Sequence, residues 1–212
     1  GMPELERTSI FHALNQKAIA RRAAKDLGKA YEEANLIVVH LGGGISVGAH
    51  EKGKIIDVNN ALDGEGAFSP ERTGGIPAGG LMRLCFSGQY TQEEIKKKIT
   101  GQGGLVAYLG TNSGIEVNEK IKAGDKNALL IYQAMAYQVA KDVGAMASVL
   151  KGKVDAIAIT GGIAYDTLFT GWIKERVEHL GKVVFYPGED ELLALVQGTL
   201  RVLKKEEEPK IY

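Results

Sequence analysis

A run of three glycines after a histidine has the composition of a phosphate-binding turn. The segment runs from His40 to Gly44 and reads His-Leu-Gly-Gly-Gly. Gly42, Gly43 and Gly44 let the backbone pass close to a ligand and turn N–H groups toward an anion. His40 can donate a hydrogen bond to a phosphate oxygen. A tight turn beside a hydrogen-bonded histidine is the alternative, and spacing alone slightly favours it.

A second glycine pair follows a predicted strand. Ile159 and Thr160 lead directly into Gly161, Gly162 and Ile163, where a helix is expected to begin. In open α/β sheets, ligands bind beyond the carboxyl ends of the strands, where glycine admits a close approach. An adenine or ribose could therefore lie on the glycine pair. A short strand-to-helix turn without a ligand is weighed equally.

Charged residues add two further candidates. Arg72 lies in a glycine- and proline-rich loop, from which a guanidinium can swing into a cleft and stabilise a transferring phosphoryl group. A lone arginine is more often a surface residue, so this interpretation depends on the two glycine segments. The acids Asp190 and Glu191 favour a helix N-terminus or face Mg²⁺ through water.

Other kinds of site are not indicated. No cluster of serine, histidine and acid points to hydrolysis. The histidines also lack metal-ligand spacing; they are His12, His40, His50 and His179.

Composition excludes several classes of partner. Of the 212 residues, 26 are Lys or Arg and 26 are Asp or Glu, so a nucleic-acid partner is not indicated. No apolar run approaches the length of a membrane span, and no signal peptide is recognisable. The single cysteine, Cys85, cannot form an intrachain disulfide, which fits a cytoplasmic protein. Its apolar neighbours predict a buried, inert thiol.

The apolar pattern predicts three strands in succession, over 36–41, 45–50 and 54–58, joined by glycine turns. A long loop over 59–80 follows. A helix is predicted over 9–27, with Phe11, Leu14, Ala18 and Ala24 on its apolar face and Gly28 as its stop. A capping box from Thr91 to Glu94 opens a short helix, and Asp125 caps a longer one that runs to about Leu150 with an apolar stripe from Tyr132 to Leu150. Two more strands are predicted over 154–160 and 183–186, a helix follows Gly161 and Gly162 to about Leu180, and a final helix covers 189–203. The charged tail 204–212 is expected to fray. Since a strand, not a helix, follows Gly44, the glycine run is a hairpin turn and not a dinucleotide fingerprint.

This order predicts an α/β fold. Three antiparallel strands followed by right-handed crossovers give a mixed five-stranded sheet with helices on both faces. That is the ribonuclease H-like, three-layer arrangement, and it is one half of the actin-like ATPase architecture. Because the chain has no internal repeat, only one half is expected in it.

Four segments together resemble the acetate kinase family. They are His40 to Gly44, Phe68 to Pro77, Thr160 to Ile163, and Ser9 to Lys17, and the last is most similar to the butyrate-type branch. The resemblance covers essentially the whole chain. It implies a short-chain carboxylate, most simply butyrate, as the substrate, with ATP and ADP as nucleotides and Mg²⁺ as the metal. Another kinase of the superfamily, such as a sugar kinase, and a non-catalytic nucleotide-binding module are the alternatives.

The resemblance also implies a role for each candidate residue. His40 and the glycines at 42–44 match the family's second phosphate-binding element, and Arg72 matches the arginine that stabilises the transferring phosphoryl group. Gly161, Gly162 and Ile163 match the segment beneath the adenosine. Asp190 or Glu191 resembles the glutamate associated with Mg²⁺. Family members commonly associate through this half, so a homo-oligomer is expected.

Three positions depart from the family pattern. Acetate kinases have asparagine where Gly43 stands and an active-site histidine where Gln16 stands, and they often place an Asp and an Arg near Ser113 to Ile115. The family's amino-terminal half, with a further phosphate loop and a catalytic aspartate, would precede Gly1. The 212 residues are therefore expected to be the carboxy-terminal domain and to have negligible activity alone.

Overall fold

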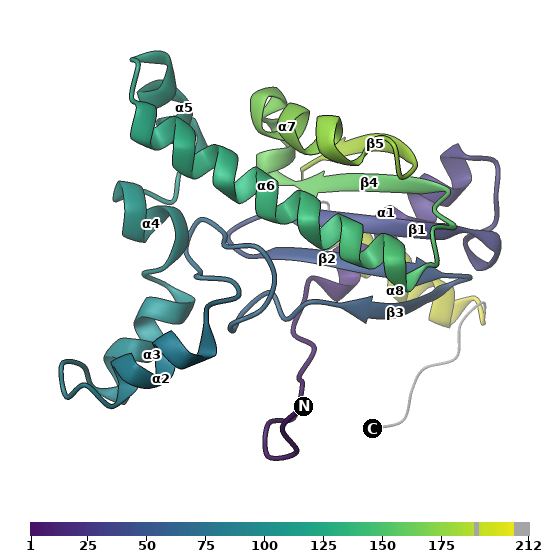
Figure 1. The fold of residues 1–212 in the computed structure, drawn as a ribbon. Coiled ribbons are helices and arrows are strands. Elements are labelled where there is room, and N and C mark those ends of the chain that lie inside the picture. Colours follow the sequence, from purple (N-terminus) through teal and green to yellow (C-terminus); the bar gives the residue numbers. More distant parts are fainter. Residues whose placement is uncertain (189–190, 206–212) are drawn as a thin grey trace.

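One mixed sheet of five strands forms the centre of the chain (Figure 1). The computed structural model describes residues 1–188 and 191–205. The strand order is β3-β2-β1-β4-β5, with β1 antiparallel to β2 and parallel to β4. Both the predicted three-stranded meander and the predicted mixed sheet are confirmed. The strands are β1 (Asn35–Leu41), β2 (Ile45–Glu51), β3 (Lys54–Val58), β4 (Ala156–Gly161) and β5 (Lys182–Pro187).

The central strand β1 is buried on both faces because its side chains alternate between two apolar cores. Ile37, Val39 and Leu41 pack into the larger core. Leu36 and Val38 pack into the smaller core on the opposite face. A strand's side chains alternate with a period of two, so His40 shares the face of Leu36 and Val38. This alternation decides which helix His40 meets.

Helices cover both faces of the sheet, giving the three predicted layers (Figure 1). The helices α6 (Lys126–Val149) and α7 (Thr167–Val177) cover the larger core, and α1 (Ala13–Asp26) covers the smaller one. Helix α8 (Glu191–Leu203) lies against α1. The predicted cap of α6 is present, since the Asp125 carboxylate accepts hydrogen bonds from the first amides of that helix. Its predicted apolar stripe, from Tyr132 to Leu150, is buried.

The buried face of α1 differs from the prediction. Leu14 was expected inside but is 50% exposed, whereas Asn15 and Gln16 are buried. The polar pair goes inward because both side chains find hydrogen-bond partners in β1 and β2. Paired polar groups can be buried at little cost, so hydrogen bonding overrides the apolar pattern. The predicted helix end is confirmed, because Gly28 adopts a φ of 72° just beyond the helix.

Four short helices extend away from the sheet between β3 and α6 (Figure 1). They are α2 (Ala78–Cys85), α3 (Gln92–Thr100), α4 (Gly104–Leu109) and α5 (Gly114–Lys122). The predicted capping box between Thr91 and Glu94 is present at the start of α3. The prediction of a buried Cys85 is wrong: α2 buries none of its residues, and this free thiol is exposed. Two short 3₁₀ turns, Tyr31–Glu33 and Gly162–Tyr165, complete the elements.

No helix within the described residues combines the length and apolar content that a membrane span requires.

Candidate functional site

The glycine run forms the turn between β1 and β2, as predicted. Gly42 donates its N–H to the carbonyl of Gly44 at 3.1 Å. A Cβ atom at Gly44 would lie 1.9 Å from Nη1 of Arg72 and 2.9 Å from the carbonyl oxygen of Ala61, whereas at Gly43 it would meet only a Glu71 carboxylate oxygen at 3.9 Å. Gly44 is therefore required for close packing. Gly43 has room for a side chain, so the asparagine of acetate kinases at this position fits the turn sterically.

His40 lies just before the turn and is almost fully buried. Its Nδ1 is 2.9 Å from Oδ1 of Asn15 on α1. Burial, with a smaller contribution from the neighbouring His12, lowers the pKa of His40 to about 3. The ring is consequently neutral near pH 7. The neutral ring carries one N–H and no positive charge. Nδ1 faces the Asn15 oxygen, which can only accept, so donation to a phosphate from Nε2 requires the other tautomer and a turned Asn15 amide.

The structure adds His12, which was not among the predicted site residues. His12 precedes α1, and its ring stacks on that of His40 with the centroids 3.7 Å apart. Its Nδ1 lies 3.1 Å from the hydroxyl of Ser46 on β2. The two histidines are far apart in the sequence, and only the packing of α1 against β1 brings them together. The one sequence signal was the presence of His12 in the segment that resembles the family.

Gln16, which stands where the family has a histidine, lies inside the fold. It is completely buried and donates to the carbonyls of Val38 and Ser46 at 3.1 and 3.2 Å. Its Oε1 is 2.9 Å from Nε2 of His50. The pKa of His50 is lowered to about 3, mainly by burial and secondarily by the charge of Lys17. This neutral network joins α1 to the sheet, so Gln16 has a structural role.

Arg72 reaches the glycine turn from its loop. Nη1 donates to the carbonyl of Ala61 at 2.6 Å, and the guanidinium rests against Cα of Gly44. The loop is attached to the turn a second time, because the Ser69 hydroxyl donates to the carbonyl of Gly43 at 2.6 Å. Nε of Arg72 is buried without a hydrogen-bond partner among the described residues. The structure thus brings together Arg72 and the glycine turn, which are distant in the sequence.

Gly161 lies beside the same turn. Since β1 and β4 are parallel, with His40 opposite Thr160, both strands end at one edge of the sheet. Gly161 has a φ of 96°, and a Cβ atom there would lie 2.3 Å from the carbonyl oxygen of Leu41. A glycine is therefore needed for β1 and β4 to approach each other. Gly162 has no such neighbours, and its α-carbon faces open space.

A pocket of about 530 Å³ opens next to Gly162 and Ile163. Its volume is in the range of small-molecule sites. Its other wall is formed by α5, α6 and the start of α7, and includes the segment from Ser113 to Ile115. The pocket's lining residues are Ser113, Gly114, Ile115, Asn118, Tyr132, Gly162, Ile163, Tyr165 and Asp166.

Asp166 fixes the shape of this pocket. One carboxylate oxygen accepts from the Tyr132 hydroxyl at 2.8 Å and from the Asn118 amide at 2.5 Å. The other oxygen caps α7 by accepting from the amides of Leu168 and Phe169. Burial, and then the charge and hydrogen bond of Asp166, raise the pKa of Tyr132, so the hydroxyl remains a donor. Three helices are thus fixed around one cavity.

The predicted metal-binding acids fall at the limit of what the structure describes. Asp190 lies outside the described residues, and Glu191 is described only as the first residue of α8. The neighbouring Gly188 exchanges two backbone hydrogen bonds with Gly161. Glu191 therefore follows closely on the edge that holds the glycine segments. Among residues 1–188 and 191–205, no group of three or more metal-ligating side chains is present.

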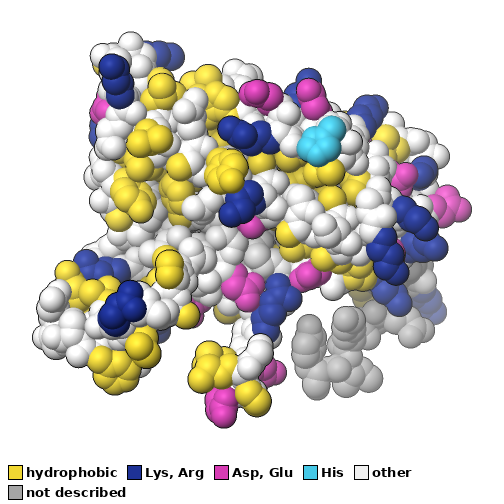
Figure 2. All heavy atoms as spheres, in the orientation of Figure 1, with side chains coloured by type: hydrophobic (Ala, Val, Ile, Leu, Met, Phe, Trp, Pro, Cys, Tyr) yellow, Lys and Arg dark blue, Asp and Glu magenta, His cyan; other side chains and the backbone are white. Residues whose placement is uncertain are grey.

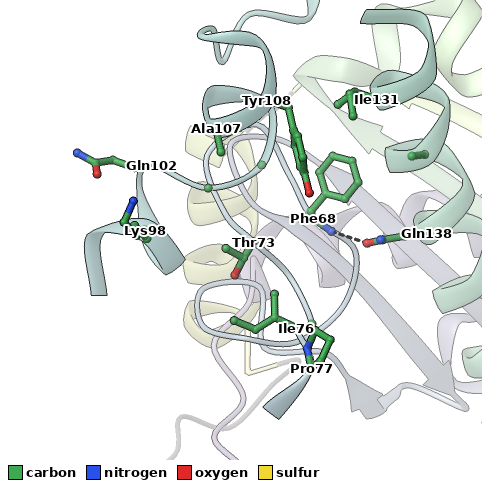
Figure 3. Close-up of a pocket in the computed structure, with 14 residues that line it drawn as sticks. Phe68, Thr73, Ile76, Pro77, Lys98, Gln102, Ala107, Tyr108, Ile131 and Gln138 are labelled. Carbon is green, nitrogen blue, oxygen red and sulfur yellow. Dashed lines mark hydrogen bonds between the residues drawn. The ribbon is translucent and has the colours of Figure 1, made fainter. Parts of the chain in front are cut away.

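A second pocket, of about 520 Å³, lies behind the Arg72 loop (Figure 3). Phe68 and Ile76 of the loop form one wall, and Ile131 and Gln138 of α6 form another. Tyr108 of α4 lies beside Phe68, with the ring centroids 6.0 Å apart. None of the predicted site residues lines it.

Comparison with known proteins places these features in a family. The sequence profile of the acetokinase family matches residues 6–199. The chain is 62% identical over 212 residues to butyrate kinase 2 of Clostridium acetobutylicum and covers 100% of its own length but 60% of that kinase. All four segments quoted above lie in the stretch aligned with that relative.

Solved structures show the same fold. An acetate kinase from Porphyromonas gingivalis superimposes with a TM-score of 0.83 at 24% identity, over 91% of this chain and 55% of its own. A propionate kinase from Francisella tularensis superimposes with a TM-score of 0.77 at 26% identity, over 86% of this chain and 53% of its own. A hexokinase of the ROK family from Thermus thermophilus shares the fold more distantly, with a TM-score of 0.53 at 16% identity, over 90% and 64%. The chain therefore spans little more than half of the solved carboxylate kinases that it matches.

Proposed function

Because the chain belongs to the acetokinase family, we propose that it supplies the nucleotide-side half of the active site of a carboxylate kinase. The proposed reaction is the reversible transfer of a phosphoryl group from ATP to butyrate, giving butyryl phosphate and ADP. The relative of 62% identity supports butyrate over other carboxylates. In this proposal the chain acts as a carboxy-terminal domain and a second half completes the cleft.

One observation carries the proposal. The glycine turn, Arg72 and Gly161 meet at a single edge of the sheet, directly beside the pocket at Gly162. Phosphoryl transfer depends mainly on positioning and on stabilising charge, and these groups suit both tasks. The turn offers N–H groups, Arg72 a permanent charge, and the pocket a space for a nucleoside.

Each group has a defined part in the proposed mechanism. The adenosine of ATP lies in the pocket on Gly162 and Ile163, and its phosphates run along the turn at Gly42 to Gly44. The neutral His40 binds a phosphate oxygen through a hydrogen bond. Arg72 leaves the Ala61 carbonyl and stabilises the negative charge of the transferring group.

Mg²⁺ is the metal that we propose for this site. The carboxylate oxygens of Asp190 and Glu191 are hard ligands of the kind that Mg²⁺ takes, often through water. When bound, Mg²⁺ neutralises charge on the phosphates. The two acids follow Gly188 closely in the sequence, and the hydrogen bonds between the backbones of Gly188 and Gly161 support this proposal.

The experiment that tests this function separates binding from turnover. The 212-residue chain is titrated with ADP by calorimetry, and butyryl phosphate is assayed for the chain alone and for the chain joined to the amino-terminal part of the related butyrate kinase. We expect weak ADP binding and negligible turnover by the chain alone, and turnover with butyrate exceeding that with acetate or hexoses in the joined protein. The absence of ADP binding would count against a nucleotide site. Full turnover by the chain alone would contradict the proposal that a second half is needed to complete the cleft.

We also propose that the kinase is a cytoplasmic homo-oligomer with small-molecule substrates and without nucleic-acid or membrane partners. Helix α2 supports the homo-oligomer, because it buries none of its residues. Met82 in this helix is 57% exposed, and Phe86, which directly follows the helix, is 88% exposed. The space-filling view shows apolar side chains on the projecting part of the molecule that contains α2 and α3, at the lower left (Figure 2). An exposed apolar face of this kind marks a protein interface, and a second copy of the same face covers it with closed symmetry.

The exposed face of α2 can be tested by one substitution. Phe86→Glu is expected to shift the oligomer to the monomer by at least about tenfold in dissociation constant, because a buried unpaired charge costs well over 1.4 kcal/mol. Sedimentation velocity measures the change, and Tyr137→Glu, at an exposed position on α6, is the control. An unchanged oligomer in Phe86→Glu would place the interface elsewhere.

A further inference from the structure

We propose that Gln138 and Asp142 of α6 are positioning residues that hold the Arg72 loop and thereby place its guanidinium at the glycine turn. The catalytic consequence rests on the function proposed above, whereas the structural consequence does not. Neither residue belongs to the glycine turn or the nucleoside pocket.

The two side chains bind consecutive amides of the loop. Oε1 of Gln138 accepts from the N–H of Phe68 at 3.0 Å (Figure 3). Oδ2 of Asp142 accepts from the N–H of Ala67 at 2.7 Å. The residues are four apart on α6, so they lie on one face of the helix, one turn apart. That spacing lets them act together on neighbouring peptide groups.

The far end of the loop is fixed by backbone contacts. Leu105 and Gly103, at the start of α4, donate their N–H groups to the carbonyls of Ser69 and Glu71 at 3.2 and 3.0 Å. Gly104 has a φ of 58°, and a Cβ atom there would lie 1.7 Å from the Ser69 carbonyl oxygen. Beyond Arg72, the N–H of Thr73 donates to the carbonyl of Ile99 at 3.1 Å, so the loop is held on both sides of Arg72. The α6 contacts are made by side chains that a substitution can remove, as is the contact of the Ser69 hydroxyl with the Gly43 carbonyl.

Asp142 binds the N–H of Ala67, but its burial as a charged group costs stability. It is half-buried, and burial raises its pKa to about 6, although the Ala67 N–H and Lys141 oppose this shift. The folded pKa lies above the usual value of 3.8, so the folded state binds the proton more tightly than the unfolded chain. Stability from this group therefore falls as the pH rises from about 4 to about 6. An asparagine would accept the same N–H without the cost of burying a charge.

Amide exchange tests the two contacts directly in the 212-residue chain. Protection of the Phe68 amide is expected to fall at least about tenfold in Gln138→Ala, and that of Ala67 similarly in Asp142→Ala, because each amide loses its acceptor. Asp142→Asn should retain the protection. Gln133→Ala, at an exposed position of the same helix, is the matched control. If Gln138→Ala does not fold, Gln138→Met removes the acceptor while keeping the side-chain length. Unchanged protection in the variants that lack an acceptor would overturn the proposal.

The complete kinase gives the functional test. Asp142→Ala and Gln138→Ala are expected to lower kcat about 10- to 100-fold with little change in KM for ATP, because the loop acts on the transition state. Asp142→Asn should restore kcat, which a general loss of stability would not predict. A kcat that does not change while protection is lost would overturn the positioning role. If the unaltered kinase itself showed no turnover, the proposed function would fail, and the exchange data would still decide whether α6 holds the loop.

Discussion

Arg72→Ala is expected to lower kcat of the complete kinase by about 10³-fold or more, since an arginine that stabilises a transferring phosphoryl group contributes factors of about 10³ to 10⁵. KM for ATP should change much less, because the interaction is strongest in the transition state. Arg72→Lys should recover little activity, as an ammonium lacks the planar fork of the guanidinium. A coupled assay of ADP formation measures all three enzymes.

The position of Arg72 in the structure supports this expectation. The guanidinium lies against Gly44 and donates to the Ala61 carbonyl, but its Nε–H is buried without an acceptor among the described residues. An unsatisfied buried donor costs about 1 to 3 kcal/mol. A phosphoryl group with several oxygens can satisfy more of the guanidinium, so the side chain gains by turning toward it.

A matched arginine provides the control for this experiment. Arg176→Ala removes an exposed guanidinium from α7 and should leave kcat within about twofold. If Arg72→Ala also retained nearly full turnover, Arg72 would have no catalytic role. The chain would then be better described as a nucleotide-binding module.

Gly161→Ala is expected to destabilise the fold, whereas Gly162→Ala, at the adjacent residue, is expected to leave the stability unchanged. At Gly161 the φ is 96°, and an added Cβ would lie 2.3 Å from the carbonyl oxygen of Leu41, so there is no space for a methyl group. We expect Gly161→Ala to lower the free energy of unfolding by about 3 kcal/mol or more, through backbone strain and separation of β1 from β4. Gly162 has neither restriction. Gly162→Ala should remain as stable as the unaltered chain, to within about 1 kcal/mol.

The ligand response distinguishes the two glycines further. Gly162 lines the pocket that we propose for the nucleoside, so an added methyl group should weaken ADP binding in a stable protein by about tenfold. Urea unfolding and calorimetric titration of the same samples measure both effects. An unfolding free energy of Gly161→Ala equal to that of the unaltered chain would show that β1 and β4 can separate without cost.

The features that sequence reasoning predicted correctly depend on local signals. A β-branched run before Gly42 and a strand after Gly44 indicate a hairpin whatever surrounds it. Helix α6 carries an apolar stripe with an aspartate cap at Asp125, and the helix forms where those two signals coincide. The mixed five-stranded sheet followed from these elements because few topologies connect them.

The features that were missed depend on tertiary contacts. Asn15 and Gln16 are polar and would be expected outside, but their partners in β1 and β2 make burial favourable. The stacking of His12 on His40 requires α1 to cross β1, which no spacing reveals. Cys85 has apolar neighbours, yet nothing within the described residues covers α2. Apolar composition therefore indicates that a surface packs against something, but it does not tell whether the partner is another part of the chain or another protein.

Helix α6 touches both ends of the proposed site, since Tyr132 lines the nucleoside pocket and Gln138 holds the Arg72 loop. Six residues separate them, which corresponds to about 9 Å along a helix axis. A helix of 24 residues that is packed against the sheet does not stretch. It therefore fixes the distance between the proposed positions of the base and of the reacting phosphate. We therefore expect discrimination by length: a nucleotide with one phosphate more than ATP can satisfy only one end of this fixed distance at a time.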